Sequence, residues 1–462
     1  MRRVFKLLSI TIVFAILCEN SIFATNTINK YALNVSTPLT AVQIAKENIA
    51  NNAYSNLIAS FYQEYIDSTS YDIITEMNTE ILQHIAPLTS NNYTVNGLPA
   101  ECYPEYYAGA YLNANYDLVI MVTEESALTK KTICDRAKET SVVFQKASYS
   151  YYELISCMED IIRLWSSGDD RFQAVKCAFI DDFENCIVIG CSNVNDEYLS
   201  FLLENLPMSY LVTIIHCDDN VDKTVALEST TIDGHTILSK YPNIVVPNLD
   251  DWDVFSYGCK ATKVVNGITK YGFITAGHAV SQGEYVFLSP PYAYSNHPLG
   301  VCITSIEQPS LGVDAAFVEI IDSNYLLSSV IPSSPYNNIS NSPTTALQGD
   351  PIHKYGSETQ TTDGHVAIAS FTINVGGTYF YKDLVVTTYD ADDGDSGGLV
   401  YYLDTTQQLA IPLGIHMMRI SPSALQGWNM LPDLNPMAQD GFFRVYCKMG
   451  YVTSYLGVSL SN

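Results

Sequence analysis

The five residues Gly394-Asp395-Ser396-Gly397-Gly398 constrain this chain more than any other segment. A serine hydroxyl is a poor nucleophile at its free pKa and needs a base that takes its proton. Flanking glycines allow a tight backbone that points N–H groups at a developing oxyanion. Alone, the string could be an ordinary turn. Residues 275–278, Thr-Ala-Gly-His, supply an imidazole upstream, and together the two segments favour Ser396 as nucleophile and His278 as base.

An aspartate between the two segments would complete a catalytic triad. Asp314 begins the run Asp-Ala-Ala-Phe-Val at 314–318, which is typical of a buried strand. Taken alone, Asp314 could instead be a loop-edge carboxylate that caps a turn. Glu284 and Glu307 lie in the same interval, but in less apolar settings, and are weaker candidates. We therefore predict that His278, Asp314 and Ser396 act together.

From about residue 250 onward the chain resembles chymotrypsin-fold serine proteases of the bacterial α-lytic protease and streptogrisin type. The order His, Asp, Ser is that of chymotrypsin and differs from the orders of subtilisin and the α/β-hydrolases. Upstream, residues 103–111 and 118–123 are similar to the pro-region of those enzymes. The matching catalytic segments are residues 271–278, 314–318, 394–398 and 413–416.

The resemblance implies a serine endopeptidase that uses no cofactor. In such an enzyme Ser396 attacks the peptide carbonyl, His278 moves the proton, and Asp314 orients His278. The N–H groups of Gly394 and Ser396 would form the oxyanion hole. Asp395 is expected to be buried and paired, with a structural role. No residue spacing suggests a metal site.

Three readings of substrate preference stay open. Asp390 lies six residues before Ser396, where the trypsin-like pattern has its pocket aspartate, and favours Lys or Arg. His416 resembles the histidine with which glutamyl endopeptidases hold glutamate, and Arg419 could add positive charge, although Asp393 would repel an acidic side chain. The third reading is a solvated acidic loop beside a His416 that is satisfied within the barrel.

The N-terminus predicts a secreted, extracellular protein. Basic residues at 2, 3 and 6 precede an apolar run at 7–17, and Ala24 offers a small residue for cleavage, so residues 1–24 are expected to be a signal peptide. The run is too short to span a bilayer. A net charge of −26 argues against nucleic acid or an anionic membrane as partners.

The positions of the cysteines in the sequence do not predict a regular disulfide framework. The chain has 11, of which Cys18 would leave with the signal peptide. In the resembled family a cysteine usually follows the catalytic histidine and forms a disulfide with another. Here that position is Ala279, which leaves Cys259 without its usual mate. We expect mostly free, buried thiols.

Residues 25–230 are predicted to be a pro-region. Helical periodicity covers residues 38–84. Two repeated α+β units then occupy 100–217, because residues 110–120 align with 178–188. Each unit is expected to run hairpin, helix, strand, which makes a ββαβ-like unit. The helices are expected near 125–139, 150–165 and 196–206, and the closing strands near 141–146 and 210–216.

Residues 231–462 are predicted to be all-β, with short apolar segments between turns. Asn266-Gly267 is a hairpin signal. The pattern suits two antiparallel six-stranded barrels of trypsin-like type with the catalytic cleft between them. A C-terminal helix is expected within 442–456.

These expectations add up to a secreted zymogen, cleaved by itself somewhere in 220–255. Its partners would be peptide or protein substrates and its own pro-region, and we expect a monomer. Because barrel strands pair non-locally, a pro-region sheet edge could assist folding. Two alternatives stay open: residues 100–217 could be a separate binding domain, and the barrels could form a catalytically silent binding protein.

Overall fold

The computed structural model describes most of the chain from Ala41 onward. The predicted signal peptide, the second half of the helix expected at 38–84 and most of the helix expected at 196–206 lie outside the described residues. Apart from isolated residues, the described ranges are 41–68, 100–113, 115–165, 174–192, 208–216, 236–240, 253–288, 298–308, 312–322, 327–331, 338–375, 379–404, 407–421 and 441–461.

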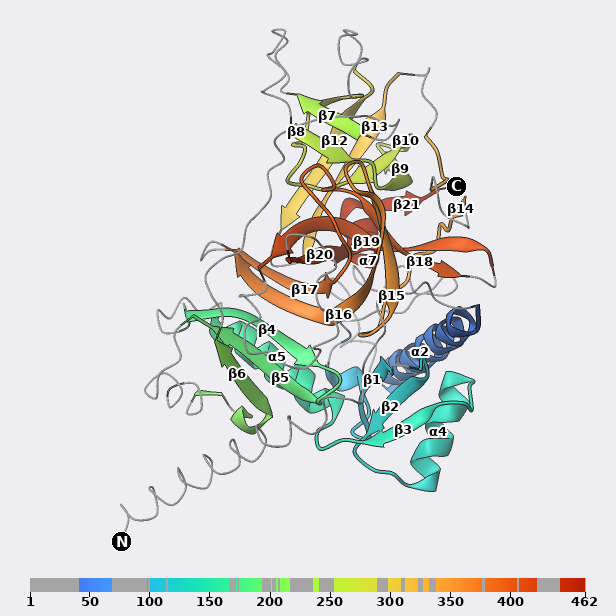
Figure 1. The fold of residues 1–462 in the computed structure, drawn as a ribbon, viewed down its shortest axis with the longest axis vertical. Coiled ribbons are helices and arrows are strands. Elements are labelled where there is room, and N and C mark those ends of the chain that lie inside the picture. Colours follow the sequence, from blue (N-terminus) through green and yellow to red (C-terminus); the bar gives the residue numbers. More distant parts are fainter. Residues whose placement is uncertain are drawn as a thin grey trace.

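The N-terminal part contains two units with one strand pattern (Figure 1). In each, an antiparallel hairpin is followed by a strand parallel to its second member. The first unit is β1 (Tyr107–Leu112), β2 (Leu118–Val122), α4 (Ala127–Ala137) and β3 (Val143–Lys146). The second contains β4 (Val175–Asp181), β5 (Cys186–Cys191) and β6 (Val212–His216). Helices α2 (Ala41–Ser68) and α5 (Tyr151–Trp165) pack beside them.

Helix α4 shows how the sequence sets these elements. Ser126 caps its first turn, because its side-chain oxygen accepts a hydrogen bond from the Thr129 N–H. At the other end Lys138 adopts φ 55°, and its N–H bonds to the Cys134 carbonyl, which closes the helix. The predicted helix at 125–139 is thus present over 127–137.

The first part of the expected protease region is an eight-stranded antiparallel sheet. Its strand order is β21-β9-β10-β13-β12-β11-β7-β8. The hairpin predicted at Asn266-Gly267 joins β9 to β10, with Asn266 at φ 52° and Gly267 at φ 78°. The strands are β7 (Thr236–Lys240), β8 (Asp253–Ser256), β9 (Cys259–Val265), β10 (Ile268–Thr275), β11 (Tyr285–Leu288), β12 (Gly300–Gln308), β13 (Val313–Ile320) and β21 (Val458–Leu460).

The second part is a ring of six strands. Their order is β15-β18-β19-β20-β17-β16, and β15 also pairs with β16. The mostly β character predicted for residues 231–462 is confirmed, whereas the six-strand count of the first barrel stays a prediction. The strands are β15 (Pro351–Gly356), β16 (Gln360–Val375), β17 (Tyr379–Thr387), β18 (Leu399–Asp404), β19 (Leu409–Ile420) and β20 (Phe443–Lys448), and the two-residue β14 (Asn338–Ile339) pairs with β19.

The expected C-terminal helix was placed too early. Residues 443–448 form β20, which pairs with β17 on one side and β19 on the other. Only α7 (Met449–Leu456) is helical. A strand buried on both faces has a continuous apolar run, and periodicity alone does not distinguish such a run from a buried helix.

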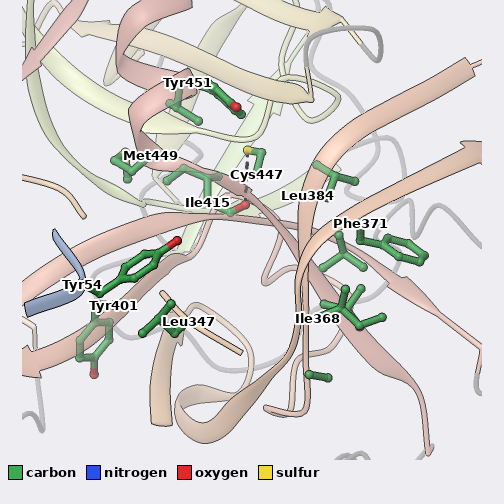
Figure 2. Packing of buried hydrophobic residues seen from close by; sticks show 14 of the residues in the cluster. Tyr54, Leu347, Ile368, Phe371, Leu384, Tyr401, Ile415, Cys447, Met449 and Tyr451 are labelled. Atoms are coloured by element: carbon green, nitrogen blue, oxygen red, sulfur yellow. Dashed lines mark hydrogen bonds between the residues drawn. The ribbon is translucent and has the colours of Figure 1, made fainter. Parts of the chain in front are cut away.

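The N-terminal part and the ring share one sheet and one core. Strand β4 pairs antiparallel with β16, so β4, β5 and β6 extend the sheet of the ring, beside it in Figure 1, and β14 completes its ten strands. Figure 2 shows Tyr54 of α2 packed near Leu347 and Tyr401 in the same cluster as Met449 and Tyr451. No helix among the described residues is long and apolar enough to cross a membrane.

Candidate active site

His278, Asp314 and Ser396 come from three separate segments that the sheets bring together. His278 follows β10, and Asp314 is the second residue of β13. These strands pair, with Thr275 opposite Ala316. Ser396 lies in the turn before β18 of the ring, and its carbonyl accepts a hydrogen bond from the Ser256 N–H, at 2.7 Å, at the end of β8. The site therefore spans both parts of the expected protease region.

The three side chains form a continuous hydrogen-bonded line. His278 Nδ1 lies 2.6 Å from Asp314 Oδ2, and His278 Nε2 lies 3.1 Å from Ser396 Oγ. The His278 backbone N–H also donates to Asp314 Oδ1, at 2.7 Å. A carboxylate only accepts, so it selects the tautomer with a proton on Nδ1. That tautomer leaves the Nε2 lone pair facing the serine hydroxyl.

Gly277 explains the glycine before the histidine. A Cβ there would lie 2.5 Å from the Ile306 carbonyl oxygen and 2.9 Å from Asp314 Oδ1. Any side chain would therefore push His278 away from Asp314.

Asp314 is 1% exposed, and its environment separates it from the other acidic candidates. The Cys447 thiol donates to its main-chain carbonyl, at 3.5 Å. Glu307 lies opposite Asp314 on β12 but accepts a hydrogen bond from Tyr381. Glu284 accepts one from the Ser281 N–H. The structure thus places Asp314 against His278, with Glu307 and Glu284 bonded elsewhere.

The turn around Ser396 bends at its glycines. Gly394 has φ 101° and Gly397 has φ 89°, both in the region that L side chains rarely adopt. A Cβ on Gly397 would lie 2.1 Å from Thr275 Oγ1. Among the described residues, neither the Gly394 nor the Ser396 N–H donates a hydrogen bond to another group. Both predicted oxyanion donors are therefore uncommitted beside the Ser396 hydroxyl.

Asp395 anchors this turn through a fully buried ion pair. Lys354 Nζ lies 2.9 Å from Asp395 Oδ2, and both side chains are 0% exposed. Asp395 also accepts hydrogen bonds from the N–H groups of Asp392 and Glu358 and from the Thr359 hydroxyl. Burial alone would raise the pKa of Asp395, but Lys354 and these donors hold it below its usual value. Asp395 is buried and paired as expected, but Lys354 carries no sequence signal that marks it.

Two of the predicted specificity residues, Asp390 and His416, lie in separate contact groups. Asp390 Oδ1 lies 3.5 Å from Arg444 Nη2, and the buried Arg444 also donates to the Ala391 carbonyl. Arg444 was missed in the sequence because it lies in an apolar run. His416 is buried, and its Nδ1 lies 3.0 Å from the Tyr389 hydroxyl. Burial lowers the pKa of His416 to about 3, so its imidazole is neutral near pH 7.

Asp393 and Arg419 are the two remaining predicted specificity residues. The Asp393 N–H donates to Asp392 Oδ1. The Arg419 guanidinium lies 5.3 Å from the centre of the Phe442 ring. Asp390 therefore has a cation partner, and His416 offers a neutral polar group.

The cysteines of this region are free and buried in the structure: Cys259, Cys302 and Cys447. Burial raises the pKa of each thiol to about 12, so none is a reactive thiolate at neutral pH. Within the described residues, no group of three or more His, Cys, Asp or Glu side chains could hold a metal ion.

Comparisons with known proteins identify one family model and several solved structures. Residues 40–147 match a family described as a Pro-like N-terminal domain. A search of curated proteins found no match. Three similar structures are Thermobifida fusca protease A (20% identity, 45% of this chain and 92% of that chain, TM-score 0.33), Nocardiopsis protease (23%, 45% and 93%, 0.34) and a glutamic acid-specific serine protease (20%, 45% and 94%, 0.34). Identities of 20–23% and TM-scores of 0.33–0.34 do not by themselves establish what this chain does.

Proposed function

We propose that this chain is a secreted serine endopeptidase made as a zymogen, with residues 231–462 as the protease and 25–230 as its pro-region. The observation that carries the proposal is the line from Asp314 Oδ2 through His278 to Ser396 Oγ, with contacts of 2.6 and 3.1 Å. A solely structural serine would not need a buried carboxylate that fixes the tautomer of its histidine partner.

The proposed reaction is acyl transfer to Ser396. Ser396 Oγ bonds to the peptide carbonyl carbon while its proton passes to His278 Nε2. The oxyanion that forms accepts hydrogen bonds from the Gly394 and Ser396 N–H groups. When the C–N bond breaks, His278 returns the proton to the leaving amine. Water then repeats the sequence on the acyl-enzyme and releases the acid.

The sheet shared by β4 and β16 supports the pro-region's proposed role as a folding aid. Three residues of β4 pair with β16, and Phe179 lies 6.0 Å from Phe371 between ring centres. Strand β16 belongs to a ring whose strands come from residues 351–448, so its closure is non-local. A preformed partner strand would lower the entropic cost of ordering β16.

Strand β7 supports a boundary on its N-terminal side. Residues 236–240 pair with β8 and with β11, within the eight-stranded sheet. Cleavage before residue 236 would keep β7 covalently attached to the sheet it completes. Within the predicted window of 220–255, we therefore favour its first part.

A fluorophosphonate serine probe tests the proposed activity. Wild-type secreted protein is expected to label on a fragment that starts upstream of residue 236, and Ser396→Ala is expected to lose the label. Ser340→Ala is the matched control, because Ser340 is buried and its hydroxyl hydrogen-bonds to Ser342 within its own turn. A folded, processed wild type that does not label would contradict the proposal and favour the silent binding protein.

The packing contact between the proposed pro-region and the protease is expected to become less stable as pH rises. Asp182, beside β4, is buried, and burial raises its pKa to about 8, with Asp181 adding to the rise and Lys448 opposing it. Its N–H lies against Gln348 of the protease. A raised carboxyl pKa means that the folded state binds more protons at this group, so the contribution of Asp182 to stability is full below about pH 4 and is lost towards pH 8.

The measurement for this prediction is the thermal midpoint of the inactive Ser396→Ala chain between pH 5 and 8. Asp182→Asn, which keeps the shape and removes the charge, should flatten the decline. Asp135→Asn is the control, because Asp135 is 64% exposed and its ion pair is with Lys131 on its own helix. Equal slopes in all three chains would contradict the role given to Asp182.

A further inference from the structure

Two buried serines outside the triad converge on the nucleophile turn. Ser256 ends β8 in the eight-stranded sheet, and Ser357 follows β15 in the ring. Ser256 is 1% exposed and Ser357 is 6% exposed. Neither serine lies in a sequence motif named above, and the proposed mechanism uses neither hydroxyl.

Both hydroxyls contact one carbonyl oxygen. Ser256 Oγ lies 2.8 Å from the Gly394 oxygen, and Ser357 Oγ lies 2.7 Å from the same atom. The Ser357 N–H donates to Ser256 Oγ, at 2.7 Å, so the two serines also hold each other. A carbonyl oxygen has two lone pairs, and two O–H donors fill both.

The carbonyl they hold belongs to the peptide between the two proposed oxyanion donors. The Gly394 C=O and the Asp395 N–H form one planar peptide unit. Its N–H end donates to the Asp392 carbonyl, at 3.0 Å. The Gly394 N–H precedes this unit and the Ser396 N–H follows it. The orientation of the unit therefore sets the angle between the two donors.

From this geometry we infer that Ser256 and Ser357 are positioning residues for the oxyanion hole, an inference that rests on the proposed function. Gly394 has the freedom that makes such a restraint necessary, because glycine adopts many conformations besides its φ of 101°. With the carbonyl held, both N–H groups stay directed at the oxyanion position. Preorganised donors of this kind act mainly on the transition state.

Ser256 also links the two parts of the protease region at this turn. Its N–H donates to the Ser396 carbonyl, at 2.7 Å, and its own carbonyl accepts from Thr275 Oγ1, at 2.8 Å, three residues before His278. The backbone of Ser256 thus joins the histidine segment to the serine turn, while its hydroxyl restrains the peptide between the donors. Substitution by alanine removes only the second of these roles.

The test is a kinetic comparison of Ser256→Ala, Ser357→Ala and the double variant, in the secreted, processed protein with a peptide amide substrate. Complete loss of an oxyanion donor lowers kcat by about 10²–10³, so loss of its restraint should lower kcat by about 10-fold in each single variant. KM and the pH profile should not change, because substrate contacts and His278 are intact. Affinity for a peptide aldehyde, which forms a tetrahedral adduct, should fall in parallel with kcat.

Two controls separate positioning from general stability. Ser340→Ala removes a comparable pair of hydrogen bonds within a turn away from the site, with 3.3 Å and 3.1 Å contacts to Ser342. Ser357→Thr retains the hydroxyl and should restore most of kcat. The single variants decide the question if the double variant does not fold.

Each outcome supports or overturns the inference. If kcat and aldehyde affinity in both single variants match those of Ser340→Ala, and only the thermal midpoint falls, the two serines are structural and the inference is wrong. A wild type that neither labels with fluorophosphonate nor cleaves substrate overturns the proposed function, and this inference with it. If the wild type labels with fluorophosphonate but the serine variants keep the kcat of Ser340→Ala, the inference is wrong and the proposed function stands.

Discussion

Replacement of Asp314 by asparagine is expected to lower kcat by about 10⁴, with KM little changed. The reason lies in the two contacts of this carboxylate. Asp314 Oδ1 accepts the His278 backbone N–H, at 2.7 Å, and Oδ2 faces Nδ1, at 2.6 Å. An asparagine would keep its carbonyl oxygen on the backbone N–H and turn its NH₂ group towards Nδ1. Nδ1 must then accept, so the proton moves to Nε2, which can no longer take the proton of Ser396.

Steady-state kinetics on the processed protein would measure this effect. Glu307→Gln is the matched control, because Glu307 lies opposite Asp314 on the neighbouring strand and bonds to Tyr381 instead of His278. We expect its kcat to stay within about threefold of wild type, since it removes a charge without changing the tautomer. An Asp314→Asn enzyme as active as Glu307→Gln would show that the triad is wrongly assigned.

The residues that meet in this candidate site could be predicted from sequence because the requirements on their neighbours are local. Gly277 avoids clashes with Ile306 and Asp314, and Gly394 and Gly397 adopt positive φ. Each constraint requires a glycine directly beside His278 or within two residues of Ser396, so it leaves a readable motif even where the clash is with a distant segment. Asp314 was found through its apolar strand, which is a local pattern as well.

The groups that support the site could not be predicted in this way. Lys354 pairs with Asp395 across 41 residues, and Ser256 reaches Gly394 across 138. A lysine or serine in an apolar stretch has the same appearance whether it is buried against a partner or exposed. The pairing of β4 with β16 is non-local in the same sense. The sequence of either segment predicts a strand, but it does not identify the partner strand.

Replacement of Lys354 by methionine is expected to have the largest effect on stability, about 3–5 kcal/mol. Methionine fills a similar volume, so the packing loss is small. Asp395, however, would stay fully buried with N–H and hydroxyl donors but no cation. The carboxylate must then take up a proton or pull the turn towards water. Either change disturbs the peptide beside Ser396, so activity should fall with stability.

Denaturant midpoints of the inactive Ser396→Ala chain would measure the loss without self-cleavage. Lys270→Met is the matched control, because its 2.8 Å contact with Glu319 is partly exposed and should contribute under about 1 kcal/mol. Adding Asp395→Asn to Lys354→Met removes the unpaired buried charge and should recover part of the lost stability. Recovery of stability without recovery of activity would show that the ion pair orients the Ser396 turn as well as stabilising the fold. If Lys354→Met matches Lys270→Met in stability, the buried pair does not anchor the turn.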